Sequence, residues 1–91
     1  MTVIAVWIKI DEQHVVQALH EAGEKLNSAD GEVLLDFAAV RRLDPKALRA
    51  MEEFADIAQH QGVKVVLRGV NVDVYKVLKL VKLAKRFSVV N

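Results

Sequence analysis

Short apolar runs alternate along this chain with segments of helical periodicity. The clearest junction lies in residues 33–54, where the apolar run VLLDFAAV passes through a short basic turn into a long helical pattern. A run of that length and composition is typical of a strand covered on both faces. Asp44 suits the cap of the helix and Pro45 suits its first turn, because the first N–H groups of a helix lack partners within it.

The same alternation extends to both ends of the chain. Turn residues at 27–31 separate the first helical pattern from the central strand, Gly62 is placed to end the long helix, and Asn71 to cap the next one. In chain order, strands are expected at 2–10, 33–40, 63–70 and 87–90, and helices at 14–26, 45–61 and 72–86.

Each expected helix has an apolar side that would face a sheet. This order predicts an α/β fold, a small, mostly parallel sheet of about four strands with helices packed against it. The expected inner residues are Val15, Leu19, Ala22 and Leu26 in the first helix, Leu48, Met51, Phe54, Ala55 and Ala58 in the second, and Val77, Leu80, Val81 and Ala84 in the third.

The length, composition and charge of the chain limit the class of protein to which it can belong. Ninety-one residues suit one domain, residues 1–91, with a single core and no deep enclosed active site. The chain has no cysteine, no apolar run of membrane-spanning length and no N-terminal secretion signal, so a cytoplasmic location is expected. The net charge of +1 is uneven, because residues 1–62 carry −5 and residues 63–91 carry +6.

The residue types that usually carry catalysis do not form a recognisable set. His14, His20 and His60 lack the spacing of metal ligands, and no Ser-His-Asp set, Cys-His set or glycine-rich phosphate loop is present. We therefore expect neither an enzyme nor a bound metal or cofactor.

Asp36 fits two interpretations. Because VLLD precedes a turn, Asp36 resembles the phosphoacceptor of a receiver domain, with Asp11 and Glu12 in the place of the metal-binding acids. However, that fold is longer, and the strand at 63–70 lacks the hydroxyl residue that a receiver carries there. We favour the alternative, a partly buried Asp36 whose carboxylate accepts N–H bonds from the following turn.

Residues 31–54 (GEVLLDFAAVRRLDPKALRAMEEF) and 62–80 (GVKVVLRGVNVDVYKVLKL) together resemble a STAS domain. This is the module of bacterial anti-sigma factor antagonists and sulphate-transporter tails. Its pattern is an apolar strand ending in Asp, an Asp-Ser-Ser/Thr-Gly turn that opens a helix, and a glycine-led strand. Asp36, Asp44 and Leu48 match the strand Asp, the turn Asp and the first core residue of the helix. The first 30 residues match only loosely, since the family's extra N-terminal strand is missing or merged into residues 2–10.

The chain departs from the family at the turn itself. The second hydroxyl of the family turn accepts phosphate from a partner kinase, and Pro45, Lys46 and Ala47 replace Ser, Ser/Thr and Gly here. A phosphate would be favoured at a helix N-terminus, whereas Lys46 places a positive charge there. The resemblance therefore implies a protein-interaction module, with an anti-sigma factor, a kinase-like protein or another STAS protein as partner, that lacks the usual phosphorylation switch. The hydroxyl-bearing residues of the chain are Thr2, Ser28, Tyr75 and Ser88.

A basic cluster surrounds the start of the long helix. The simplest interpretation is a set of solvated charges on a turn. The resemblance implies instead a partner-binding surface, and free N–H groups with nearby cations could alternatively bind a small anion or nucleotide. The candidate binding residues are Asp36, Arg41, Arg42, Asp44, Lys46 and Arg49.

Lysines are spread over the last expected helix at positions 76, 79, 82 and 85, followed by Arg86. Such a series is usually a solvated face, but a basic amphipathic helix also suits an anionic membrane surface, nucleic acid or an acidic partner. Nucleic acid is not expected, because Tyr75 is the only aromatic residue of that helix before Phe87 and a stacking platform needs more.

The first expected strand could allow two copies of the chain to associate. Without the family's extra strand, residues 4–10 would lie near an exposed sheet edge with Trp7 partly uncovered. Pairing of two copies through that edge would give a weak homodimer.

Overall fold

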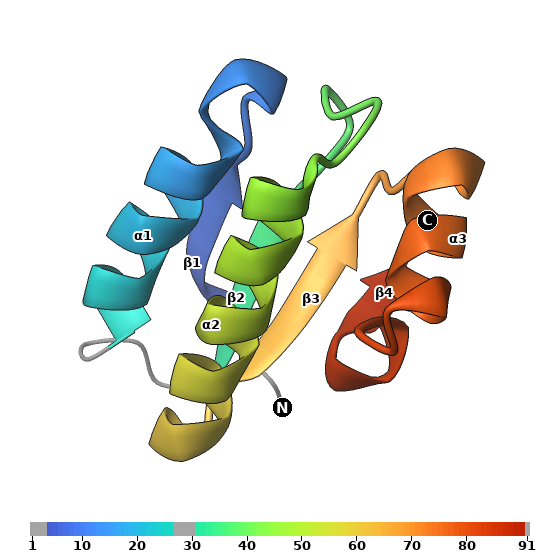
Figure 1. Cartoon of the computed structure of the whole chain (residues 1–91). Coiled ribbons are helices and arrows are strands. Elements are labelled where there is room, and N and C mark those ends of the chain that lie inside the picture. The colour runs from blue at the N-terminus through green and yellow to red at the C-terminus, as the bar shows by residue number, and fades with distance from the viewer. Residues whose placement is uncertain (1–3, 27–30, 91) are drawn as a thin grey trace.

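The computed structural model describes residues 4–26 and 31–90. Strands and helices alternate from one end to the other (Figure 1). In chain order the elements are β1 (Ile4–Lys9), η1 (Glu12–His14), α1 (Val15–Lys25), β2 (Glu32–Asp36), α2 (Pro45–Gln61), β3 (Lys64–Arg68), α3 (Val72–Leu80), η3 (Ala84–Arg86) and β4 (Ser88–Val90).

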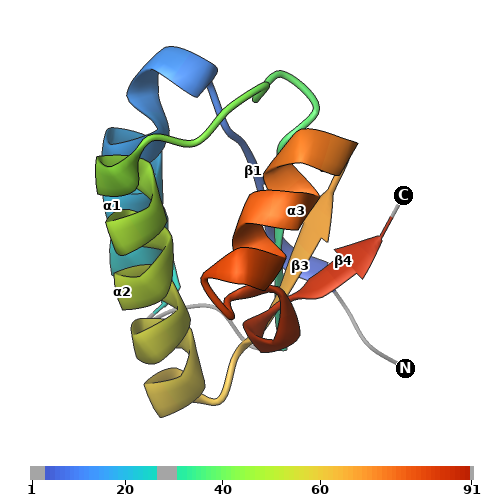
Figure 2. The same cartoon turned by 45° about the vertical axis from the view of Figure 1, so that its right-hand side comes forward.

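All neighbouring strands of the sheet pair in parallel, in the order β1-β2-β3-β4. One register row runs from Trp7 through Leu34 and Val66 to Ser88. Right-handed crossovers between strands laid down in this order place successive helices on the same face of the sheet. Figures 1 and 2 show α1, α2 and α3 on that face. The predicted α/β fold with a four-stranded parallel sheet is confirmed.

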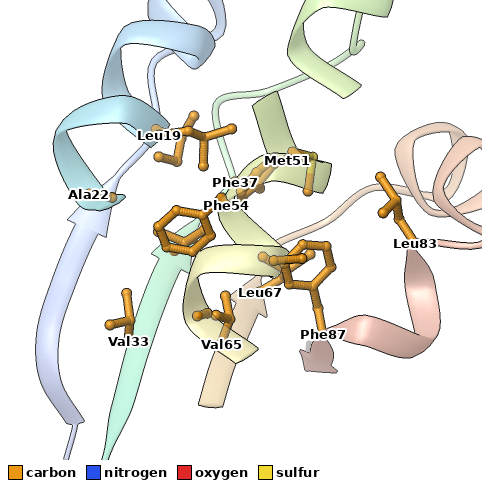
Figure 3. Close-up of a cluster of buried hydrophobic side chains, with 14 of the residues drawn as sticks. Leu19, Ala22, Val33, Phe37, Met51, Phe54, Val65, Leu67, Leu83 and Phe87 are labelled. Atoms are coloured by element: carbon orange, nitrogen blue, oxygen red, sulfur yellow. The ribbon is translucent and has the colours of Figure 1, made fainter. Parts of the chain in front are cut away.

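The core lies between the sheet and the three helices. Alternate residues of the central strands, Val33 and Leu35 in β2 and Val65 and Leu67 in β3, face the helices, as the two-residue period of a strand requires. Figure 3 shows side chains of α1, α2 and the C-terminal segment meeting over these strands. The buried helical residues are Val15, Leu19 and Ala22 in α1, Ala47, Met51, Phe54, Ala55 and Ala58 in α2, and Val74 and Leu78 in α3.

The opposite face of the sheet carries none of the described helices. Leu34 and Val66 point to this face and are nevertheless only 6% and 8% exposed. Trp7, in the same row on the edge strand β1, is 57% exposed, and the Arg68 guanidinium lies 5.5 Å from the centre of its ring. Strand β1 is therefore at the sheet edge with Trp7 partly uncovered, as expected from the sequence.

The central strand is shorter than predicted. Strand β2 ends at Asp36 instead of Val40, because the Asp36 carboxylate accepts a bond from the Ala38 N–H (2.9 Å) and bends the chain. The apolar run continues in the turn, where Phe37 and Val40 are buried without being in a strand. In α2, Leu48 is half-buried and Ala47 is the residue that reaches the core.

The last helix differs most from its prediction. Helix α3 ends at Leu80 instead of Arg86, and Lys82 has a positive φ of 64° in the turn that follows. Its inner residues are Val74 and Leu78, whereas the predicted inner residue Leu80 is 81% exposed. Apolar residues occur at helical spacing on both sides of this segment, and the pair Val74 and Leu78 is the one that faces the core. The turn predicted at 27–31 falls mostly in 27–30, outside the described residues.

Candidate functional site

The loop between β2 and α2, residues 37–44, lies at the carboxyl edge of the parallel sheet. The connections after β1 and β3 reach the same edge, since parallel strands end on one side. Figure 2 shows this loop above the sheet, between the start of α1 and the start of α3. Five of the six predicted site residues lie in it or in the first turns of α2.

Glu12 connects this loop to the first strand-helix connection. One oxygen of its carboxylate accepts hydrogen bonds from the backbone N–H groups of Arg41 (2.6 Å) and Arg42 (3.0 Å). Bonds from backbone N–H groups to an ionised acceptor are among the stronger hydrogen bonds in proteins. The loop is therefore fixed from the α1 side by a residue about 30 positions earlier.

Asn71 holds the loop from the other side. Its Oδ1 caps α3 by accepting from the Val74 N–H (2.7 Å), while its Nδ2 donates to the carbonyls of Val40 (3.3 Å) and Arg41 (3.2 Å). One amide side chain thus caps α3 and also binds the loop before α2.

A third connection runs to the end of β3. The Phe37 N–H donates to the Arg68 carbonyl at 2.7 Å, which continues the β2–β3 pairing into the loop. Gly69 follows with a φ of 76°, and a Cβ there would lie 3.0 Å from the Cα, Cβ and N of Ala38. The backbones approach so closely that only glycine fits without a shift. The loop is therefore held from three sides by contacts with other parts of the chain.

The first turn of α2 presents cations around a capped N-terminus. The Asp44 carboxylate accepts from the Ala47 N–H (2.7 Å), and Pro45 occupies the first turn as predicted. Arg41, Arg42, Lys46 and Arg49 are exposed, and within the described residues none of the four is paired with a carboxylate. These four cations are therefore exposed to solvent around the start of α2.

The backbone donors of this region are largely taken by the chain's own carboxylates. Glu12 binds two of them and Asp44 a third. A phosphate or nucleotide would need such N–H groups free at the helix start. These three N–H groups are therefore not free to bind a phosphate or nucleotide.

A hollow of about 710 Å³ lies beside the loop, between α1 along its length and the first turn of α2. Arg42, Asp44 and Ala47 line it from the loop side, and α1 contributes most of the rest. Its carboxylates are Glu12, Glu21, Glu24 and Asp44, so an acidic hollow adjoins the basic cluster. Sequence reasoning missed this contribution of α1, because nothing in a helical pattern shows which loop it will adjoin.

Asp36 stands apart from the basic cluster. It is half-buried and binds the Ala38 N–H, as the favoured interpretation predicted. The acids that a receiver domain would use for metal are also engaged, since Asp11 accepts from the Gln13 N–H (2.9 Å) and Glu12 from the loop. Among residues 4–26 and 31–90 no three acidic or histidine side chains are grouped to hold a metal ion.

The carboxyl of Asp11, which precedes the first helical segment, has a lowered pKa. The Gln13 N–H and the His14 side chain, whose Nδ1 lies 3.4 Å from an Asp11 oxygen, lower the pKa of this carboxyl below its ordinary 3.8. A carboxyl that is always ionised near neutral pH fits a capping residue.

A family model described as "Mlab, STAS domain" matches residues 9–90, nearly the whole of the described chain. The chain belongs to the STAS domain family. The match includes residues 9–30, where the resemblance in the sequence was loose. No curated protein sequence matches this STAS domain.

Solved structures share the fold at low sequence identity. A candidate anti-sigma factor antagonist from Thermotoga maritima, TM1081, superposes in its crystal structure with a TM-score of 0.77 at 18% identity, covering 100% of this STAS domain and 83% of that chain. The NMR structure of TM1081 gives 0.78 at 18% identity, covering 100% and 78%. A variant of RsbS from Moorella thermoacetica gives 0.78 at 21% identity, covering 99% and 82%.

Proposed function

We propose that this STAS domain is a non-catalytic protein-interaction module of the anti-sigma factor antagonist type that works in the cytoplasm. The observation that carries the proposal is the loop 37–44, fixed on three sides by Glu12, Asn71 and Gly69 and bearing unpaired cations. A rigid surface loses little conformational freedom when a partner binds, which favours affinity.

The partner would be a protein, either an anti-sigma factor, a kinase-like protein or another STAS protein. Arg41, Arg42, Lys46 and Arg49 would contact its acidic residues, while Asp36 and Asp44 shape the loop and cap the helix. One structural neighbour, TM1081, supports the class of partner only by its description as a candidate anti-sigma factor antagonist.

We also propose that partner binding is not switched by phosphorylation at this turn. Pro45, Lys46 and Ala47 carry no hydroxyl group, and Ala47 is buried against the core. If the turn aligns with the family as its sequence suggests, Lys46 would carry a positive charge where the phosphorylated residue of a switched domain places negative charge. Binding would then be controlled by the state or the abundance of the partner.

A photo-crosslinking residue introduced at Ala39, which is exposed in the loop, tests the docking surface in living cells of the source organism. We expect a defined cross-linked protein that is lost on Arg41→Glu with Arg42→Glu. The same crosslinker at exposed Gln59, near the far end of α2, is the control and should not capture that protein. Equal capture from both positions would contradict the proposal.

Anion or nucleotide binding at the same turn is the alternative. Calorimetry with phosphate and with nucleotides tests this alternative. Binding of either ligand by the native protein that is lost in the double variant Lys46→Ala with Arg49→Ala would support a small-anion site in place of protein docking. The weak homodimer through β1 likewise stays a prediction, and a monomer whose sedimentation is independent of concentration would contradict it.

A further inference from the structure

The outward face of α3 is unusually apolar for a solvent-exposed helix. Of the eight large apolar side chains that are exposed in the described chain, four belong to α3 or to the residue that ends it: Val72, Tyr75, Leu80 and Val81. Leu80 is 81% exposed and Val72 is 69% exposed, the two highest values of the eight. These residues contribute little to the core, so folding does not explain them.

Lysines lie between these apolar side chains. Positions 72, 76 and 80 are four residues apart and therefore share one stripe of the helix, which places Lys76 between Val72 and Leu80. Lys79 lies next to that stripe, with its Nζ 5.8 Å from the centre of the Tyr75 ring. The face thus combines protruding apolar groups with cations.

The turn after α3 adds two more cations around a hollow. Tyr75, Lys79, Lys82, Ala84 and Lys85 line a depression of about 500 Å³. Within the described residues, none of the lysines at 76, 79, 82 and 85 is paired with a carboxylate. By contrast, Lys64 and Arg86 are neutralised by Glu32 (3.5 Å) and Asp56 (2.7 Å). The positive charge at residues 76–85 is therefore open to an external anion.

We propose that this face binds the surface of an anionic phospholipid bilayer, with Val72 and Leu80 entering the interfacial region and the lysines contacting lipid phosphates. Apolar side chains flanked by lysines are the pattern of helices that lie in a membrane interface. Lysine stems add apolar contact there while the ammonium groups stay at the level of the headgroups.

A bilayer fits this face better than an acidic polypeptide does. A partner helix or strand would need an apolar groove to receive it, whereas Leu80 protrudes from α3 and the hollow beside it is bordered by lysines. No described helix is long and apolar enough to cross a bilayer, so the contact would be peripheral. With a nine-residue helix and few inserted groups, binding would be reversible and weakened by salt.

The inference is independent of the proposed docking loop. The loop 37–44 and the start of α2 lie at the carboxyl edge of the sheet, beside the start of α3. Lys79 lies at the opposite end of α3, and Lys82 and Lys85 follow that end.

Sedimentation with phospholipid vesicles tests the proposal on the full chain. We expect binding to vesicles of equimolar phosphatidylglycerol and phosphatidylcholine at low salt, and loss of binding at high salt or with phosphatidylcholine alone. Lys76→Gln with Lys79→Gln should weaken partitioning about 25-fold, since each lysine near an anionic surface is worth roughly a factor of five. Leu80→Ser should weaken it several-fold.

Matched controls separate local contact from net charge. Lys46→Gln with Arg49→Gln removes the same charge from α2, and Ile57→Ser removes an apolar side chain that is 42% exposed on α2. Both should retain vesicle binding, and circular dichroism checks that all variants fold. Binding to neutral vesicles as strong as to anionic ones would overturn the proposal, and so would losses of binding in the control variants equal to those in the α3 variants. Binding to soluble polyglutamate in place of vesicles would also overturn it and would indicate an acidic polypeptide as the partner.

Discussion

The carboxylate of Glu12 lies 2.6 Å from the backbone nitrogen of Arg41, and this contact joins the first and second strand-helix connections of the sheet. Glu12→Ala would leave the N–H groups of Arg41 and Arg42 without this acceptor. We expect a loss of about 1–2 kcal/mol in the free energy of unfolding, at the lower end for hydrogen bonds to a charged group because the site is exposed. Urea unfolding measures this loss.

Hydrogen exchange provides the local readout for the same contact. The amides of Arg41 and Arg42 should exchange faster in Glu12→Ala, while core amides such as that of Leu35 change only with global stability. Glu12→Gln keeps an acceptor oxygen and should show a smaller effect. Unchanged protection of both loop amides in Glu12→Ala would show that Glu12 does not hold the loop.

Asn71 performs two tasks that substitutions can separate. Asn71→Ala removes the cap of α3 and the bonds to Val40 and Arg41, and should cost about 1–2 kcal/mol in unfolding free energy. Asn71→Asp keeps the capping oxygen but loses the Nδ2 donor, so it should retain α3 while loosening the loop. Amide exchange at Val74 and in residues 38–42 distinguishes the two variants. If Asn71→Asp accelerates amide exchange equally at Val74 and in residues 38–42, the cap and the loop bonds are not separate functions of Asn71.

Two glycines with similar backbone angles offer a matched pair. Gly69→Ala would place a Cβ 3.0 Å from the backbone of Ala38, whereas Gly62→Ala would meet nothing within 4 Å, and both have φ near 70°. Gly62→Ala should cost about 1 kcal/mol from the left-handed backbone alone. Gly69→Ala should cost roughly 1–3 kcal/mol more because of crowding. Equal melting temperatures of the two variants would refute the close approach.

The fold was largely predictable because its signals are local. Asp44, Pro45 and Gly62 delimit α2 through capping and backbone chemistry that depends on neighbouring residues alone, and the structure has that helix at Pro45–Gln61. The alternation of apolar runs with segments of helical periodicity is also a local signal, and it predicts the strands and the α/β class.

Features that depend on distant contacts were not predictable. The periodicity of the last helix predicts Val77, Leu80, Val81 and Ala84 on its inner side, but the structure buries Val74 and Leu78. Which of two apolar sides packs on the sheet depends on contacts with distant residues, such as those of Asn71 with the loop before α2. The role of Glu12 was missed because its partners lie about 30 residues away. Of the site, the sequence yielded the basic cluster and the cap, but not the contacts that make the loop rigid.

Acid should destabilise the start of the first helical segment by protonating Asp11. The pKa of Asp11 is lowered in the folded state, chiefly by the Gln13 N–H, to below its ordinary 3.8. The ionised carboxylate therefore stabilises the folded protein at pH values above the ordinary pKa, and this stabilisation is lost as the pH falls through the lowered pKa. Asp11→Asn should therefore reduce stability at neutral pH and flatten that part of the acid profile. An NMR titration of the Asp11 carboxyl with a midpoint above 3.8 would contradict the assignment.

The central claim is a docking surface without a phosphorylation switch, and phosphate transfer tests it most directly. The partner protein captured through Ala39, if it is a kinase, is incubated with ATP and either the native protein or a variant with Pro45→Ser, Lys46→Ser and Ala47→Gly. Peptide mass spectrometry then locates any phosphate. The account predicts none between Asp44 and Leu48 in the native protein, and phosphate with release of the partner in the variant. Phosphate on the native protein in that segment would contradict it.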